Sequence, residues 1–177
     1  DYVVCKCMVS VLIMYKIMLF SGGLYKYDLL VEHVDDVGGL IIQKDSLQIS
    51  RNTSFLREEI KVLLIVPSNE ISSVKSLAKE IKGEIEEVEL EDAIHKKLIK
   101  SLKIYDILSK SNSWLNTESI KKQMEAEKEL INNVDAMKKE YIPKVEECLE
   151  LMLTLEILQR RHENNEFEYC IILDDKK

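Results

Sequence analysis

The sequence has little of what marks several common protein classes. Its 177 residues include five glycines, two prolines and one tryptophan, which excludes collagen-like and proline-rich chains. Basic residues are not in excess: the formal net charge is −7, which argues against a nucleic-acid partner. Because 46% of the residues are hydrophobic, the chain is too apolar for a disordered protein. We therefore expect one folded domain, or one domain with a helical appendage.

The sequence also lacks a long hydrophobic run. Lys6 and Lys16 interrupt the apolar N-terminal stretch, and the uncharged segment Cys7–Tyr15 has only nine residues. A membrane-spanning helix needs about 20 apolar residues, and we recognise no cleavage site of a signal peptide. These absences predict a cytoplasmic protein with no membrane partner and with reduced cysteines.

The four cysteines do not have the spacing of a metal site. Cys5 and Cys7 would share one face of a strand, but Cys148 and Cys170 are distant and lack the paired CxxC pattern. A buried free cysteine behaves as a small hydrophobe. The histidines show no HExxH motif. We expect no metal, no cofactor and no catalytic residues, so an enzyme is not indicated, although catalytic groups can meet in space without a sequence motif.

Hydrophobic periodicity divides residues 8–90 into four strands and two helices. Gly38 and Gly39 supply the expected stop of the first helix, and residues 51–59 are polar enough to predict a loop. The resulting order is β-α-β-β-α-β, which is typical of ferredoxin-like folds. The predicted strands are residues 8–20, 40–50, 60–66 and 84–90, with helices near 24–37 and 71–82.

After Leu90 the hydrophobic pattern is helical. It predicts helices near 94–108, 117–141 and 145–162, with Asn116 as the N-cap of the second, and a C-terminal strand at 167–173. The expected fold class is α+β: a ferredoxin-like βαββαβ sandwich over about 8–90, followed by a three-helix appendage and a short strand. The expected domains are 1–90 and 91–177, packed separately or as one unit.

One short motif predicts a binding site. Ser21, Gly22 and Gly23 lie between a predicted strand and a predicted helix, where backbone amides and the helix dipole can bind an anion. A plain strand-to-helix turn explains the same residues. An enzyme that binds a nucleotide at this turn is the lowest-ranked of the functions considered.

Four residues are candidates for a protein interface. Trp114 lies between two predicted helices, where it either fills the joint or anchors a partner. Leu151, Leu155 and Leu158 belong to a predicted helix with apolar residues on all sides, which indicates burial on several sides. An apolar stripe left over by such a helix would support a homodimer.

Three segments between Met18 and Leu90 carry a family resemblance: SGGLYKYDLLVEHVDDVGGLIIQKD, VLLIVPSNE and VKSLAKEIKGEIEEVEL. Residues 18–90 thereby resemble the N-terminal region of methanogenesis marker protein 7. The resemblance implies a methanogen accessory protein that assists the assembly or activation of methyl-coenzyme M reductase within a protein complex. Residues 91–163 have no counterpart in that family, so the resemblance assigns no site residue.

Two functions follow from these patterns. The first is a non-enzymatic archaeal accessory or scaffold protein that acts through protein–protein contacts, linked by the resemblance to methyl-coenzyme M reductase. The alternative is a regulatory domain of ferredoxin-like type that responds to a small molecule, which is an analogy from the expected fold.

Overall fold

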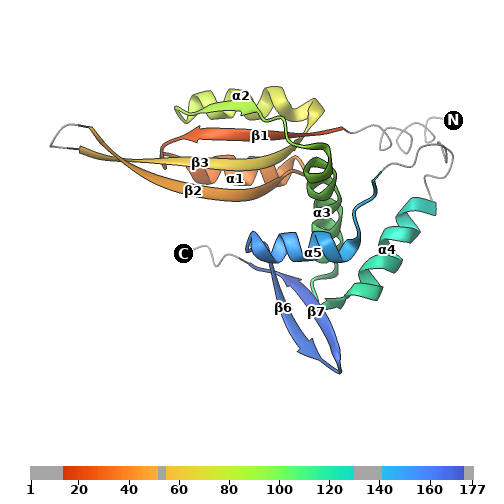
Figure 1. Ribbon diagram of the computed structural model, residues 1–177. Helices are drawn as coiled ribbons and strands as arrows, with labels where there is room; N and C mark the ends of the chain where they lie inside the picture. The colour runs from red at the N-terminus through yellow and green to blue at the C-terminus, as the bar shows by residue number, and fades with distance from the viewer. Residues whose placement is uncertain (1–13, 52–54, 130–140, 174–177) are drawn as a thin grey trace, which may run out of the picture. The chain divides into compact units, whose positions relative to one another are not determined.

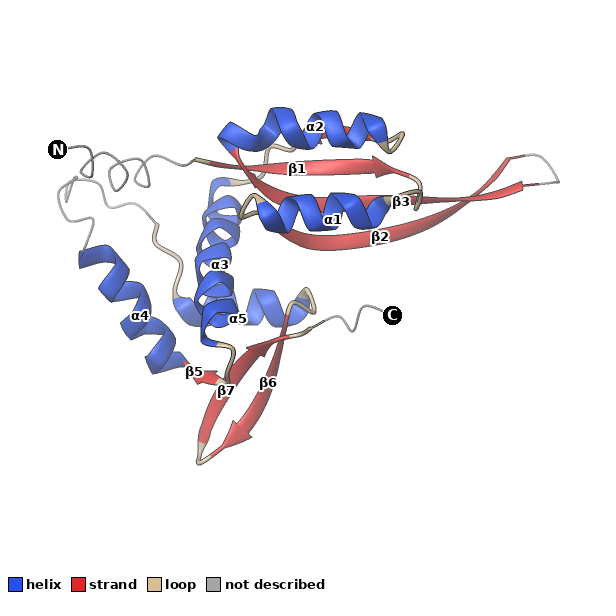
Figure 2. Cartoon of the chain, turned by 180° about the vertical axis from the view of Figure 1, so that it is seen from behind, coloured by secondary structure: helices blue, strands red, loops and turns tan. Residues whose placement is uncertain are grey.

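The computed structural model describes residues 14–51, 55–129 and 141–173. The chain divides into two units between Glu89 and Leu90. The described residues form five α-helices and two antiparallel sheets, so the fold is mixed α/β (Figures 1 and 2). Residues 8–13 of the first predicted strand lie outside the described residues.

The first unit is a four-stranded antiparallel sheet with two helices. The strand order is β2-β3-β1-β4, so the two strands at the centre of the sheet, β3 and β1, are distant in the sequence. The elements are β1 (Tyr15–Gly22), α1 (Tyr27–Asp36), β2 (Leu40–Arg51), β3 (Phe55–Pro67), a 3₁₀ turn (Ser68–Glu70), α2 (Ile71–Glu80) and β4 (Glu84–Glu87).

Both helices of the first unit pack on the same face of the sheet. Side chains alternate between the faces of a strand, so every second residue of β1 and β3 points toward the helices. Phe20, for example, belongs to the same buried cluster as Leu30 of α1 and Val74 of α2. The cluster contains Met18, Phe20, Tyr27, Leu30, Val34, Ile60, Val62, Leu64, Val66, Val74, Ala78 and Ile81.

The prediction of a loop over residues 51–59 is wrong for its second half. β3 begins at Phe55, and the β2–β3 ladder extends to the pair Arg51↔Phe55. A β-ladder is made of backbone hydrogen bonds. The polar composition of this segment therefore does not prevent pairing.

The second unit combines three helices with a three-stranded antiparallel sheet of order β5-β7-β6. Its core includes Ile104, Ile120, Leu149 and Met152, which are nearly inaccessible to solvent. The elements are α3 (Asp92–Ser111), β5 (Leu115–Asn116), α4 (Thr117–Glu129), α5 (Val145–Thr154), β6 (Leu158–Glu163) and β7 (Glu166–Ile171).

The predicted helix over residues 145–162 is wrong beyond Thr154. Glu156 adopts φ 58°, which is incompatible with a continuing helix, and a strand begins at Leu158. Asn164 and Asn165, with φ 52° and 62°, form the two-residue turn that joins β6 to β7. The three-helix appendage therefore also holds a β-hairpin in place of the single terminal strand.

Candidate functional site

The Ser21-Gly22-Gly23 motif lies mostly inside a strand. Ser21 and Gly22 are paired residues of β1, opposite Lys61 and Ile60. Helix α1 begins only at Tyr27, after a turn in which Lys26 adopts φ 52°. Four residues thus separate Gly22 from the helix. The anion site stays a prediction.

Three large apolar side chains are exposed around the start of α1. Leu24, Tyr25 and Leu29 are 44%, 57% and 40% exposed. Lys26 Nζ and Lys82 Nζ lie 5.4 and 5.6 Å from the centroid of the Tyr25 ring. We call these five residues the Tyr25 patch. Apolar surface that includes an aromatic ring is typical of protein-binding sites, and the two ammonium groups favour an acidic partner.

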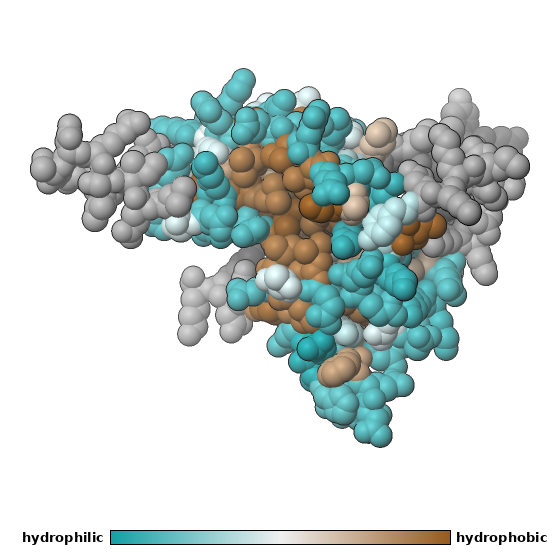
Figure 3. Space-filling model, viewed as in Figure 1, coloured by the Kyte–Doolittle hydropathy of each residue, from teal (hydrophilic) through white to brown (hydrophobic). Residues whose placement is uncertain are grey.

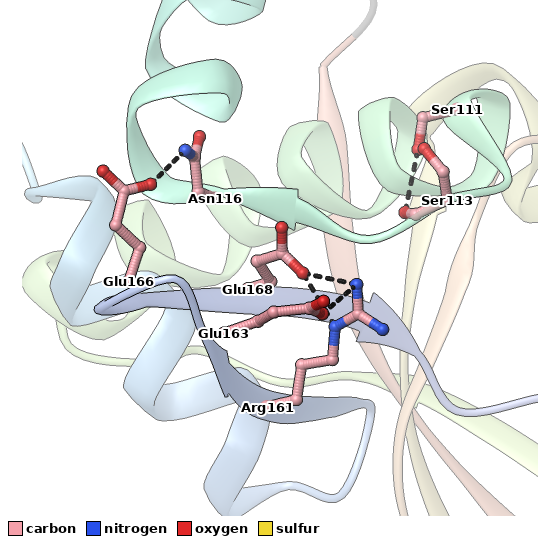
Figure 4. Close-up of polar contacts among 7 residues, drawn as sticks. All are labelled: Ser111, Ser113, Asn116, Arg161, Glu163, Glu166 and Glu168. Carbon is pink, nitrogen blue, oxygen red and sulfur yellow. Dashed lines mark hydrogen bonds and ion pairs between the residues drawn. The ribbon is translucent and has the colours of Figure 1, made fainter.

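Trp114 is half-buried beside the three-stranded sheet, and its ring is covered by an arginine of the same unit. The guanidinium carbon of Arg161 lies 4.5 Å from the centroid of the Trp114 ring. Arg161 also forms ion pairs with Glu168, at 2.6 Å, and with Glu163, at 2.8 Å (Figure 4). The tryptophan thus belongs to a network of charged side chains, an arrangement that sequence spacing alone does not reveal because residues 114 and 161 are distant in the chain.

Asn116 lies opposite Glu168 in the sheet and contacts the tip of the hairpin. Its Nδ2 donates a hydrogen bond to Glu166 Oε2 at 2.6 Å (Figure 4). Its Oδ1 accepts a hydrogen bond of 2.9 Å from the backbone N–H of Ser119, which confirms the predicted N-cap of α4. We call the six residues Trp114, Asn116, Arg161, Glu163, Glu166 and Glu168 the acidic sheet face.

The three leucines predicted at an interface differ in burial. Leu158 is 2% exposed and belongs to the core of the second unit, beside Tyr169 and Ile171. Leu151 and Leu155 are half-buried. Of these three leucines, Leu151 and Leu155 therefore keep side-chain surface that is accessible to a partner.

A polar chain links α1 to α2 in the first unit. His33 Nε2 lies 3.0 Å from Ser73 Oγ, and Ser73 Oγ lies 3.0 Å from Glu70 Oε2. Here the hydroxyl lies between the imidazole and the carboxylate, whereas in a catalytic triad the imidazole is the central group. The chain thus joins two helices, and its order is not that of a nucleophile with an oriented base. No sequence pattern reveals this contact, because residues 33 and 73 meet only through the packing of α1 against α2.

A hollow at the N-terminal end of α5 is lined by Lys100, Lys121 and Lys144 among other residues. Lys121 pairs with Glu146, and this hydrogen-bonded contact lowers the pKa of the Glu146 carboxyl. Lys100 Nζ donates a hydrogen bond to the carbonyl of Pro143. Two of these three lysines are thus engaged with groups of the chain.

The two cysteines that the structure describes are free thiols. Cys148 is buried, which raises the pKa of its thiol, and Cys170 is half-buried on β7. Within residues 14–51, 55–129 and 141–173, no group of three potential ligands (histidine, cysteine, aspartate or glutamate) is placed to hold a metal ion. Cys5 and Cys7 lie outside the described residues.

Comparison with known proteins concerns the first unit. Residues 15–95 match the family described as methyl-coenzyme M reductase operon protein C. Over 80 residues the chain is also 34% identical to an uncharacterized protein of Methanocaldococcus jannaschii, which covers 45% of this chain and 23% of that protein. The predicted N-terminal resemblance to a methanogen family connected with methyl-coenzyme M reductase is confirmed. The chain matches less than a quarter of the length of this relative.

No solved structure is significantly similar to the chain. In the part of the chain that the structure describes, no helix combines the length and the apolar character needed to cross a membrane.

Proposed function

We propose that this chain is a non-enzymatic accessory protein of the methyl-coenzyme M reductase system and that it acts through protein–protein contacts. The match of residues 15–95 to the operon protein C family carries the proposal. It covers the whole four-stranded sheet and both of its helices. The accessory role is therefore assigned to the first unit.

The Tyr25 patch is the proposed contact surface of this unit. It lies within the matched residues and exposes three large apolar side chains. Lys26 and Lys82 flank the Tyr25 ring, so we propose that the patch docks on an apolar spot with acidic neighbours. The proposed partner surface belongs to methyl-coenzyme M reductase itself.

We also propose that the first unit is of the ferredoxin-like type. Its element order, β-α-β-β-α-β, and its strand order, β2-β3-β1-β4 with antiparallel neighbours, support this assignment. Such a sheet with both helices on one face fits a binding module as well as an enzyme. The fold alone therefore does not carry the functional proposal.

Direct binding tests the proposed function. The full chain, immobilised on a sensor, is exposed to purified methyl-coenzyme M reductase at micromolar concentration. We expect saturable binding that Tyr25→Ala weakens about tenfold, as for an interface hot spot. Ile94→Ala is the matched control, because Ile94 is 44% exposed in the second unit. Absence of binding, or equal loss in both variants, contradicts the proposal.

Self-association as a homodimer stays a prediction whose structural basis has changed. Helix α5 ends at Thr154 and Leu158 is a core residue, so the proposed contact is confined to Leu151 and Leu155. Light scattering at micromolar concentration measures it. A mass near 20.6 kDa contradicts a dimer. A dimer that Leu151→Glu or Leu155→Glu dissociates supports it.

A further inference from the structure

The acidic sheet face is built by strand alternation in the second unit. Arg161 is directly opposite Glu168 on β7, which is opposite Asn116 on β5. Side chains at directly opposite positions share a face, and Trp114, two residues before Asn116, continues that face. On the opposite face, Leu158, Tyr169 and Ile171 enter the core of the unit, and Leu115 packs against it.

Trp114 and Arg161 form a pre-ordered pair on this face. The guanidinium stacks 4.5 Å from the indole centroid and is held by two carboxylates, at 2.6 and 2.8 Å. Tryptophan and arginine are the residues most enriched at interface hot spots. Because both side chains are fixed by contacts within the unit, little side-chain entropy remains to be lost when a partner binds.

The same network contributes little to the stability of the fold. The ion pairs of Arg161 are partly exposed, with 43% of the Arg161 side chain and 50% of the Glu163 side chain accessible. Partly exposed ion pairs of this kind contribute little to the stability of a protein. The mostly hydrophilic surface of the β6–β7 hairpin is visible at the bottom of Figure 3.

The charges of this face decide which partner fits. The carboxylates of Glu163 and Glu168 pair with the guanidinium of Arg161. The third carboxylate, of Glu166, contacts the neutral amide of Asn116. The face therefore carries more negative than positive charge around its aromatic anchor. A partner surface with lysine or arginine side chains is attracted to it, whereas an acidic surface or a nucleic acid is repelled.

We propose that the acidic sheet face is a docking surface for a partner protein that presents a basic surface, with Trp114 as the anchor. This surface lies outside residues 15–95, so it is independent of the proposed function of the first unit. The acidic sheet face favours a positively charged partner, whereas the Tyr25 patch favours a negatively charged one. The chain would thus bring two proteins of different charge together.

A displayed library of random twelve-residue peptides is the probe that tests this inference. Peptides are selected on the full chain and synthesised for affinity measurement. We expect the selected peptides to carry more lysine and arginine than acidic residues. We also expect Trp114→Ala to weaken their binding about tenfold or more. Their binding should weaken with added salt.

Charge variants separate specific docking from general attraction to an acidic protein. Glu163→Gln with Glu166→Gln keeps side-chain shape and an acceptor oxygen but removes two charges from the face, and we expect it to weaken binding several-fold. The matched control is Glu84→Gln with Glu86→Gln, which removes two charges from exposed positions of β4. This control should leave the affinity unchanged, and both pairs of substitutions should leave the melting temperature nearly unchanged because all four side chains are exposed.

Three results would overturn the inference. The first is selection of neutral or acidic peptides. The second is an equal loss of affinity in the β4 control, which shows attraction to net charge alone. The third is a dimer in light scattering that Trp114→Ala dissociates, because a second copy of the chain then occupies the face. If Trp114→Ala does not fold, the glutamate variants alone decide the question.

Discussion

Gly83 lies directly against the ring of Phe20. A Cβ added at residue 83 would stand 2.2 Å from Phe20 Cε2, and Phe20 is fully buried in the core of the first unit. The end of α2 can therefore approach β1 only because residue 83 has no side chain.

Gly83→Ala should destabilise the first unit by about 1–3 kcal/mol, since the ring must move within a packed core. Urea unfolding of the full chain measures the change. Gly23→Ala is the control, because the nearest atoms beyond its two chain neighbours lie 4.0 Å from the added Cβ. Equal stability of the two variants would contradict the packing described here.

Leu158→Ala should cost about 2–5 kcal/mol, because this side chain is 2% exposed in the core of the second unit. Leu155→Ala should cost less, since Leu155 is half-buried. Thermal melting followed by circular dichroism measures both. A larger effect at Leu155 would favour a continuous helix over the β6–β7 hairpin.

Asn116→Ala should destabilise α4 by about 1 kcal/mol through loss of its N-cap. Asn116→Asp keeps the acceptor oxygen for the Ser119 amide but loses the donor to Glu166. Hydrogen exchange of the Ser119 amide distinguishes them. It should accelerate clearly in the alanine variant and little in the aspartate variant. The opposite ranking would mean that the contact with Glu166 matters more than the cap.

Ser73→Ala should cost about 1 kcal/mol, because it removes the hydroxyl that joins His33 on α1 to Glu70. Ser76→Ala is the control on the same helix. Its hydroxyl contacts only the Ser72 carbonyl in the contacts observed, and alanine is the better helix former. Chemical unfolding should show a loss at residue 73 and little change or a gain at residue 76. Equal changes at the two positions would show that the contacts of the Ser73 hydroxyl with His33 and Glu70 do not stabilise the fold.

Cys148 should react more slowly with iodoacetamide than Cys170 at pH 8. Burial raises the pKa of the Cys148 thiol, so less of the reactive thiolate is present.

A thiol whose pKa is raised by folding contributes stability that is complete below its unfolded pKa. That stability is lost as the pH rises through the folded pKa. Peptide-resolved mass spectrometry measures both rates, and equal rates in the folded chain would contradict the burial of Cys148.

Local patterns predicted most of the first unit. The helical spacing of Leu30 and Val34 and the glycines that follow them determine where α1 runs and ends. The apolar run ending at Pro67 determines the central strand β3. These signals were readable because each depends on residues within a few positions of one another. The order of the strands in the sheet depends on pairing between distant segments.

In the second unit, local sequence patterns fail to predict part of the structure. Residues 155–162 were predicted to continue a helix, but the chain forms a strand from Leu158 onward, because Leu158 pairs with Ile171 and enters the core. Trp114 was recognised as a candidate anchor from its type and place. The neighbours of Trp114 were not predicted, because Arg161 contacts the Trp114 ring only when β5, β7 and β6 pair into one sheet. The sequence by itself predicted most of the helices and strands of the first unit and the cap at Asn116. Only the tertiary structure decided which charged side chains surround the tryptophan, since cross-strand neighbours are set by long-range pairing.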